Sequence, residues 1–322
     1  MKPLLKVSGL TKHFPSKNHN FFGKREFVHA VDDVSFEIAT GETLGLVGES
    51  GCGKSTTGRL ITKLIPATSG NIEFSGQDIT NMKLNEFRNL RPQIQMIFQD
   101  PYASLNPRHT VGTIIATPLK IHGKKYGIDV KKQVQELLEI VGLNPEHYNR
   151  YPHEFSGGQR QRIGIARALA LKPKLIIADE PVSALDVSIQ AQILNLLQSL
   201  QTEFNLSFIF IAHDLAVVRH FSKRVAVMYA GNIVEVSDHV NLYANPKHPY
   251  TKALMSAVPS ADPDAVGARE RIRLSGDIPS PISPPSGCRF RTRCWKAQDV
   301  CTTKPPLIQI GKSLVACHFP EA

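Results

Sequence analysis

Apolar runs and polar turns alternate along the first 48 residues. The runs 4–14 (LLKVSGLTKHF) and 30–48 (AVDDVSFEIATGETLGLVG) are rich in Val, Ile and Leu, with a turn at Thr40–Gly41, and predict strands. The segment 15–27 between them (PSKNHNFFGKREF) is polar, so we expect a loop there.

Three later runs are short and mainly apolar, at 93–98 (QIQMIF), 174–179 (KLIIAD) and 206–213 (LSFIFIAH). Runs of this kind are typical of strands that are buried on both faces of a parallel sheet. The segment 224–236 (RVAVMYAGNIVEV) has a glycine turn between two apolar stretches and predicts a hairpin.

Helical patterns lie between these strands. Residues 55–64 (STTGRLITKL) predict a helix, and the region from 103 to about 165 is largely helical, including 130–142, which ends at a glycine typical of a C-cap. In 188–204 the apolar positions share one helical face: Ile189, Ile193, Leu196, Leu197 and Leu200. Alternating strands and helices predict an α/β fold with a mainly parallel sheet.

Composition is ordinary for a soluble globular protein of 322 residues. The N-terminal MKPLLKVSGL lacks the apolar core of a signal peptide, and the longest apolar runs fall well short of the roughly 18 residues of a membrane span. We therefore expect a cytosolic chain that reaches a membrane through partners. The net charge of +10 suits nucleic acid, an anionic membrane surface or simply a solvated basic surface.

The stretch 48–56 (GESGCGKST) fits the phosphate-loop pattern G-x-x-x-x-G-K-[ST] between a predicted strand and a predicted helix. Its glycines let backbone N–H groups converge on phosphate oxygens, Lys54 brings a positive charge to the β and γ phosphates, and Ser55 offers an oxygen to Mg²⁺. The expected nucleotide-binding residues are Gly48, Glu49, Ser50, Gly51, Cys52, Gly53, Lys54, Ser55 and Thr56.

Two acidic residues end the apolar run at 174–179. Asp179 can hold Mg²⁺ directly or through water, and Glu180 can position or deprotonate an attacking water. Because this pair follows a phosphate loop, the sequence predicts nucleotide hydrolysis rather than binding alone.

Five motifs in a fixed order resemble those of ATP-binding cassette ATPases: GESGCGKST, FSGGQRQR, KLIIADEP, SALD and IAHD. They span residues 48–214. The resemblance implies that the chain binds and hydrolyses ATP with Mg²⁺. It also implies a P-loop NTPase (RecA-like) core with an antiparallel β subdomain and a helical subdomain.

The resemblance gives the SGGQ stretch a role in a second subunit. In this family the loop contacts the γ-phosphate that is held in the partner's cradle, so two subunits pack head to tail around two nucleotides. The corresponding residues here are Ser156, Gly157, Gly158 and Gln159, with Asp186 connecting the two sites. ATP then closes the dimer and hydrolysis opens it. The alternative is that SGGQ only caps a helix.

Three further residues take their roles from the resemblance. Gln99 corresponds to the glutamine that reaches Mg²⁺ or the attacking water, and His213 to the histidine that contacts the γ-phosphate and orients Glu180. Phe14 stands where an aromatic ring stacks on adenine, with a core phenylalanine as the alternative. The expected catalytic residues are Glu180, His213 and Gln99, and the expected Mg²⁺ ligands are Ser55, Gln99 and Asp179.

Two longer stretches, 245–259 (NPKHPYTKALMSAVP) and 287–294 (GCRFRTRC), resemble the ATPase subunits of oligopeptide and dipeptide permeases, and most of all the second of two paralogous ATPases. This implies an importer with a paralogous ATPase subunit as heterodimer partner, two transmembrane permease subunits and, indirectly, an extracytoplasmic peptide-binding protein. The chain would lie peripherally on the cytoplasmic face of the inner membrane of a bacterium.

One alternative remains for the transported ligand and one for the class of protein. Nickel and glutathione importers share this architecture. Soluble cassette ATPases that act on DNA or ribosomes have long coiled-coil insertions or two fused cassettes, which this sequence lacks, so we expect no nucleic-acid partner.

Four cysteines, Cys288, Cys294, Cys301 and Cys317, follow the proline-rich linker 278–287 (IPSPISPPSG). A reducing cytosol disfavours disulfides, and four thiolates suit zinc or an iron–sulfur cluster. The resemblance to permease ATPases with this extension implies a [4Fe–4S] cluster that staples the extension, with zinc or unliganded thiols as alternatives. The neighbouring cations would balance the charge of such a cluster: Arg289, Arg291, Arg293 and Lys296.

These expectations divide the chain in two. Residues 1–250 form an ATPase domain, with the helical subdomain inserted at about 103–165, and residues 251–322 form a C-terminal extension that carries the four cysteines.

Overall fold

The computed structural model describes residues 2–19, 25–122, 129–257 and 271–321. The chain forms two compact units. Unit 1 consists of Met1–Ile38, Thr43–Thr80 and Ala212–Ala322, and unit 2 of Ala39–Glu42 and Asn81–Ile211.

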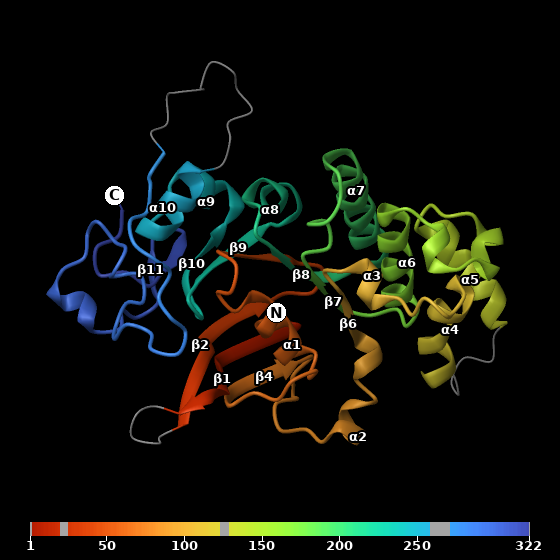
Figure 1. Ribbon diagram of the computed structural model, residues 1–322, viewed down its shortest axis with the longest axis horizontal. Coiled ribbons are helices and arrows are strands. Elements are labelled where there is room, and N and C mark those ends of the chain that lie inside the picture. Colours follow the sequence, from red (N-terminus) through yellow and green to blue (C-terminus); the bar gives the residue numbers. More distant parts are fainter. Residues whose placement is uncertain (1, 20–24, 123–128, 258–270, 322) are drawn as a thin grey trace, which may run out of the picture. The chain divides into compact units, whose positions relative to one another are not determined.

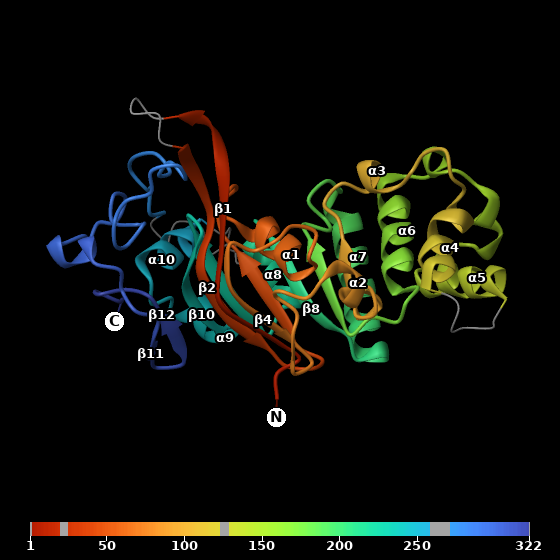
Figure 2. The same cartoon turned by 90° about the horizontal axis from the view of Figure 1, so that it is seen from below.

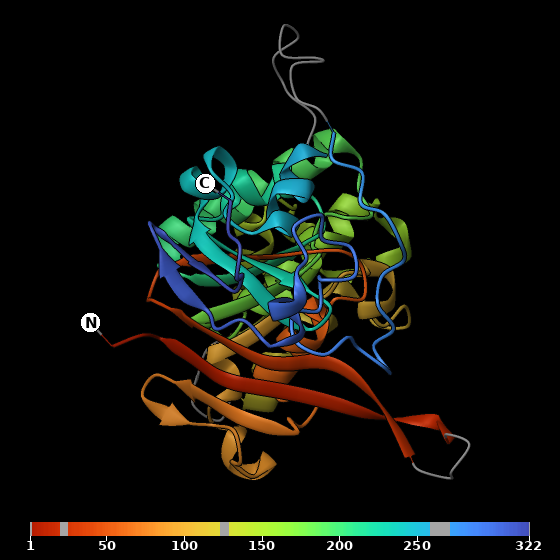
Figure 3. The same cartoon turned by 90° about the vertical axis from the view of Figure 1, so that its left-hand side faces the viewer.

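Unit 1 contains an antiparallel sheet in the order β2-β1-β4-β5 (Figure 2). Its strands are β1 (Leu5–His19), β2 (Arg25–Ile38), β4 (Ser69–Phe74) and β5 (Gln77–Asp78). Figure 3 shows β1 and β2 as long ribbons that run side by side. This sheet is the antiparallel β subdomain that the sequence led us to expect.

The prediction of a loop at residues 15–27 is wrong for 15–19 and 25–27, which are strands, whereas residues 20–24 lie outside the described residues. Strand β1 continues to His19 and β2 begins at Arg25, with Pro15 opposite Phe27. The pairing of the two strands provides the backbone hydrogen bonds whatever the polarity of the side chains. Pro15 lies beyond the stretch of β1 that pairs with β4, so its missing N–H interrupts no ladder on that side.

A second sheet of unit 1 has the order β11-β12-β10-β9-β3, in which β3 and β9 are parallel and the other neighbours are antiparallel. The strands are β3 (Thr43–Val47), β9 (Arg224–Tyr229), β10 (Asn232–Asp238), β11 (Ile308–Ile310) and β12 (Ser313–Val315). The hairpin predicted at 224–236 is thus confirmed as β9 and β10.

Helix α9 lies beside β10 (Figure 1). The helices of unit 1 are α1 (Lys54–Ile61), α8 (Leu215–Phe221), α9 (His239–Ala244), α10 (Pro249–Ser256) and the 3-10 turn η6 (Asp299–Thr302). The proline-rich segment 278–287 has no regular structure, but it packs on β2, because the carbonyl oxygen of Pro281 accepts a hydrogen bond from the His29 N–H at 2.8 Å.

Unit 2 contains the three parallel strands β6 (Ile94–Ile97), β7 (Leu175–Asp179) and β8 (Ser207–Ala212), in the order β8-β7-β6. Every residue of β7 and β8 is buried, as their unbroken apolar runs predict. No helix in the described ranges is both long and apolar enough to cross a membrane.

The region 103–165 of unit 2 is largely helical, as predicted, and α4, α5 and α6 lie together (Figure 2). The elements of unit 2 besides its strands are α2 (Leu84–Phe87), η1 (Arg91–Gln93), α3 (Pro101–Ser104), α4 (Val111–His122), α5 (Val130–Ile140), η3 (Pro145–Asn149), η4 (Pro152–Glu154), α6 (Gly157–Leu169) and α7 (Val187–Phe204).

Helices α6 and α7 meet at a glycine. Ile193, Leu197 and Leu200 of α7 are buried as predicted, whereas Ile189 and Leu196 are half-buried. A Cβ added at Gly158 of α6 would lie 2.5 Å from Cγ2 of Ile189. The first turn of α6 therefore approaches α7 at a distance that only glycine allows.

This contact predicts opposite effects for two glycines of the same helix. Gly158→Ala should lower the free energy of unfolding by about 1–3 kcal/mol, because Ile189 branches at Cβ and cannot move aside without strain. Gly164→Ala is the matched control: a Cβ there meets nothing within 4 Å. It should raise the free energy of unfolding by about 0.5–1 kcal/mol through helix propensity. Urea unfolding measures both values, and equal stability of the two variants would contradict the close packing of α6 on α7.

Candidate nucleotide site

The phosphate loop runs from the end of β3 to the start of α1 in unit 1. Nearby backbone atoms leave no room for a side chain at two of its glycines. Gly48 and Gly53 have φ values of +151° and +105°. A Cβ at Gly48 would lie 2.1 Å from the carbonyl oxygen of Met228, and one at Gly53 would lie 2.3 Å from that of Ala30. Because both obstacles are backbone atoms, no side chain can be accommodated, and the loop stays open to a ligand.

Lys54 opens α1 and is only 4% exposed. Its ammonium group donates hydrogen bonds to the carbonyl oxygens of Gly48 at 2.7 Å and Glu49 at 3.0 Å. A buried charge is costly unless an opposite charge compensates it, and the phosphates of a nucleotide would supply that charge. Burial raises the pKa of the neighbouring Cys52 thiol, so this residue acts as a small neutral packing group rather than a reactive thiolate.

Unit 2 brings Gln99 and Glu180 together. The Gln99 side-chain amide donates to a carboxylate oxygen of Glu180 at 2.8 Å. Glu180 has a φ of +45°, a conformation that costs a non-glycine residue about 1–3 kcal/mol and that occurs often at active sites. Its N–H donates to the carbonyl oxygen of Ile211 on β8 at 2.9 Å, which fixes the backbone after β7. Asp179, at the end of β7, is 2% exposed.

The SGGQ stretch forms the N-terminus of α6 in unit 2. The Ser156 hydroxyl accepts a hydrogen bond from the N–H of Gln159 at 3.4 Å, and the Gln159 side-chain oxygen accepts one from the N–H of Ser156 at 3.0 Å. This capping box confirms that the stretch caps its own helix. Ser156 is nevertheless exposed, and so is Asp186, which precedes α7. The helix end therefore stays accessible to an anion.

Phe14 and His213 lie in unit 1. Phe14 is half-buried on β1, with the Lys12 ammonium 4.9 Å from its ring centre, so it is not a core phenylalanine. His213 is exposed directly after β8.

The four cysteines of the extension line one small cavity, together with His248 and Phe290. Burial raises the pKa of the Cys288, Cys294 and Cys317 thiols, that of Cys317 to about 11. Within the described residues, no three of these thiols lie within 4.8 Å of one another. A tetrahedral zinc with bonds of about 2.3 Å would bring its sulfurs to about 3.8 Å. The thiols thus share a cavity without the geometry of a single-ion site.

Each cation near the cysteines has a partner among the described residues, and Arg291 and Lys296 also line the cysteine cavity. Their partners are Asp32 for Arg289, Ser286 for Arg291, Glu49 for Arg293 and Glu321 for Lys296. Two of these pairs, Arg289 with Asp32 and Arg293 with Glu49, attach the extension to the rest of unit 1. The contact of Arg293 with Glu49 is a site feature that the sequence did not reveal, because no motif joins residues 244 positions apart.

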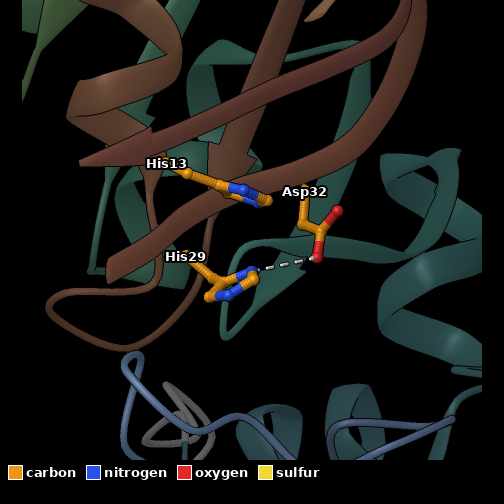
Figure 4. A group of neighbouring side chains, drawn as sticks. All are labelled: His13, His29 and Asp32. Carbon is orange, nitrogen blue, oxygen red and sulfur yellow. Dashed lines mark ion pairs between the residues drawn. The ribbon is translucent and has the colours of Figure 1, made fainter. Parts of the chain in front are cut away.

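Asp32 belongs to a second group, with His13 and His29, which Figure 4 shows on β1 and β2. The two imidazole rings are 4.0 Å apart, and His29 Nδ1 lies 3.8 Å from a carboxylate oxygen of Asp32. Burial and the nearby positive charges of His13 and Arg289 lower the pKa of His29. The Arg289 guanidinium also binds the Asp32 carboxylate. Because its positive charge would repel a metal cation at this position, we assign no metal to this group.

The comparisons with known proteins agree with this geometry. Residues 31–183 match the ABC transporter family, and residues 234–301 match the oligopeptide/dipeptide transporter C-terminal region. The chain is 57% identical over 320 residues to the oligopeptide transport ATP-binding protein OppF of Salmonella typhimurium, covering 98% of this chain and 96% of the relative. It is 54% identical over 319 residues to the oligopeptide transport ATP-binding protein AppF of Bacillus subtilis, covering 98% and 97%.

A solved structure shares the fold. It is a dimeric post-hydrolysis state of the ATP-binding cassette MJ0796 bound to ADP and Pi, with a TM-score of 0.65 and 29% identity over 73% of this chain and 98% of that chain. The α/β P-loop fold expected from the sequence is thereby confirmed. The chain belongs to the ATPases of the ABC transporter family, and it carries the oligopeptide/dipeptide transporter C-terminal region.

Proposed function

We propose that the chain is the ATP-binding and hydrolysing subunit of a membrane ABC importer for oligopeptides or dipeptides. The observation that carries this proposal is the likeness to oligopeptide transport ATP-binding proteins along nearly the whole chain. The C-terminal region favours peptides over nickel or glutathione, since its match is to an oligopeptide/dipeptide transporter region.

The phosphate loop binds the triphosphate. The residues at 48–56 and Lys54 hold it, and Phe14 stacks on the adenine. Ser55, Gln99 and Asp179 would hold Mg²⁺, whose chemistry is to neutralise charge that develops on the phosphates. The glycine-lined loop, the buried Lys54 and the buried Asp179 suit these ligands.

Glu180 then orients the attacking water and takes up its proton, and Gln99 holds the Glu180 carboxylate in place. His213 contacts the γ-phosphate. The strained backbone of Glu180 supports this assignment, because a conformation of this cost persists where the surrounding structure fixes it.

A partner subunit completes each site. The exposed Ser156, with Gly157, Gly158 and Gln159 at the start of α6, binds the γ-phosphate in the partner's cradle, and Asp186 connects the two sites. Loss of the γ-phosphate removes these charge-assisted hydrogen bonds, so hydrolysis opens the dimer. The partner is a paralogous ATPase subunit, and the pair drives two transmembrane permease subunits at the cytoplasmic face of the membrane.

The extension 251–322 carries a structural [4Fe–4S] cluster on Cys288, Cys294, Cys301 and Cys317. The cavity that the four cysteines share supports this. When bound, the cluster cross-links four segments of the extension. The four cysteines would hold it in the cavity that His248 and Phe290 also line.

Glu180→Gln tests the hydrolytic step. The variant keeps the shape of the side chain but cannot accept a proton, so we expect ATP turnover of the assembled transporter to fall about 10²–10⁴-fold. Affinity for Mg-ATP should be unchanged. Glu139→Gln, at an exposed position of α5, is the matched control and should keep full turnover. Normal turnover in Glu180→Gln would remove this carboxylate from the mechanism.

Ser156→Asp tests the role in the partner's site. Aspartate caps a helix as well as serine does, so the isolated chain should fold and bind Mg-ATP normally. In the assembled transporter its charge would face the γ-phosphate, and ATPase activity should fall about 100-fold. Ser156→Asn keeps the cap without the charge and should lose far less. If Ser156→Asp weakened ATP binding equally in the isolated chain, the contact would lie in its own site.

Anaerobic purification tests the cysteine site. We expect iron and sulfide in the wild type and in Cys52→Ser, and loss of both in Cys301→Ser. Because the thiols must lose protons to bind, and burial has raised their pKa, retention of iron should decrease as the pH falls. A folded, colourless wild type without iron would refute the cluster, and stoichiometric zinc would replace it with a zinc site.

A further inference from the structure

The C-terminal extension contacts the phosphate loop directly, at Glu49. The guanidinium of Arg293 donates to the two carboxylate oxygens of Glu49 at 3.0 and 3.3 Å. The side chain of Arg293 is 9% exposed and that of Glu49 is 25% exposed. A pair this sheltered is screened less by water and salt than a pair on the surface.

Glu49 is also held through its backbone. Its N–H donates to the hydroxyl of Tyr250 on α10 at 3.0 Å, and its carbonyl oxygen accepts from the Lys54 ammonium at 3.0 Å. One residue of the loop therefore joins α10, the cysteine-bearing segment and the lysine that faces the phosphates. A shift of Glu49 would move one of the carbonyl oxygens that accept a hydrogen bond from the Lys54 ammonium.

Arg293 is itself fixed by a buried aromatic cluster. The rings of Tyr229, Tyr250 and Phe290 lie with centroids 4.6, 5.2 and 5.4 Å apart, and none is more than 1% exposed. The N–H of Arg293 donates to the carbonyl oxygen of Phe290 at 2.9 Å, and its guanidinium also reaches the Tyr229 hydroxyl at 3.4 Å. The arginine is thus held in place before any nucleotide arrives.

We propose that Arg293 is a positioning residue for ATP binding: it fixes Glu49 and neutralises the Glu49 carboxylate next to the triphosphate. Without Arg293, an uncompensated negative charge would stand in the loop that receives a polyanion. The affinity for ATP therefore depends on the C-terminal extension. This inference rests on the proposed binding of ATP by the phosphate loop.

The test is Arg293→Gln in the full chain, alone and in the assembled transporter. We expect the Kd and the KM for Mg-ATP to rise about 5- to 20-fold. The kcat at saturating ATP should stay within about twofold, because the substitution touches binding rather than the attacking water. Arg291→Gln is the matched control, since Arg291 lies two residues away and donates to Ser286 instead. It should leave both constants unchanged.

Removing the opposing charge should restore affinity. Glu49→Gln with Arg293→Gln leaves no unpaired carboxylate, so the double variant should bind Mg-ATP more tightly than Arg293→Gln alone. Arg293→Lys keeps the charge and should lose less than Arg293→Gln. Wild-type affinity in Arg293→Gln, or a double variant as weak as Arg293→Gln, would overturn the proposal. If Arg293→Gln fails to fold, Arg293→Lys and the double variant decide the question by the same measurement.

The Lys54→Ala variant distinguishes a failure of this inference from a failure of the proposed function. If the wild type binds Mg-ATP and Lys54→Ala does not, the phosphate loop is the ATP site, and a normal Arg293→Gln refutes only the role of Arg293. If the wild type does not bind Mg-ATP, or Lys54→Ala binds it as well as the wild type, the proposed function fails first.

Discussion

A buried ammonium group is the constraint on which the nucleotide site depends. Lys54 is almost fully shielded from water and is held by two neutral carbonyl oxygens, which compensate its charge only in part. The loop around it accepts no side chain at Gly48 or Gly53, because backbone oxygens stand where a Cβ would lie. The loop thus surrounds a positively charged group, and that charge is fully compensated only when a phosphate binds. Glu49, tied to Tyr250 and Arg293, connects that space to the C-terminal extension.

In unit 2, single residues both stabilise the fold and belong to the proposed nucleotide site. Ser156 caps α6 within its own chain and remains exposed at the end of the helix, which is what a contact with a partner's phosphate requires. Glu180 adopts a strained backbone that β8 holds in place, and Gln99 orients its carboxylate. The two glycines after Ser156 permit close packing at the start of α6, because Leu185 lies against Gly157 and Ile189 of α7 lies against Gly158.

Much of the fold follows from local patterns in the sequence. Buried parallel strands such as 174–179 are specified by their own apolar residues, and the phosphate loop by its own glycines and lysine. The strand segments 15–19 and 25–27 were missed because their side chains are mainly polar and because the two segments are stabilised by pairing with each other. The pair of Arg293 with Glu49 was missed because it depends on how distant segments pack: the local pattern shows an arginine among cysteines, and only the fold shows where its guanidinium lies.

The central claim is that one triphosphate is held between the Lys54 cradle of one ATPase subunit and the Ser156 loop of another. The most direct measurement is a structure of the assembled transporter trapped with Mg-ATP. The account predicts the Lys54 ammonium on the phosphates and, on the same γ-phosphate, the SGGQ loop of the second ATPase subunit. A closed, nucleotide-bound complex in which Ser156 faces solvent, or contacts the nucleotide of its own chain, would contradict it.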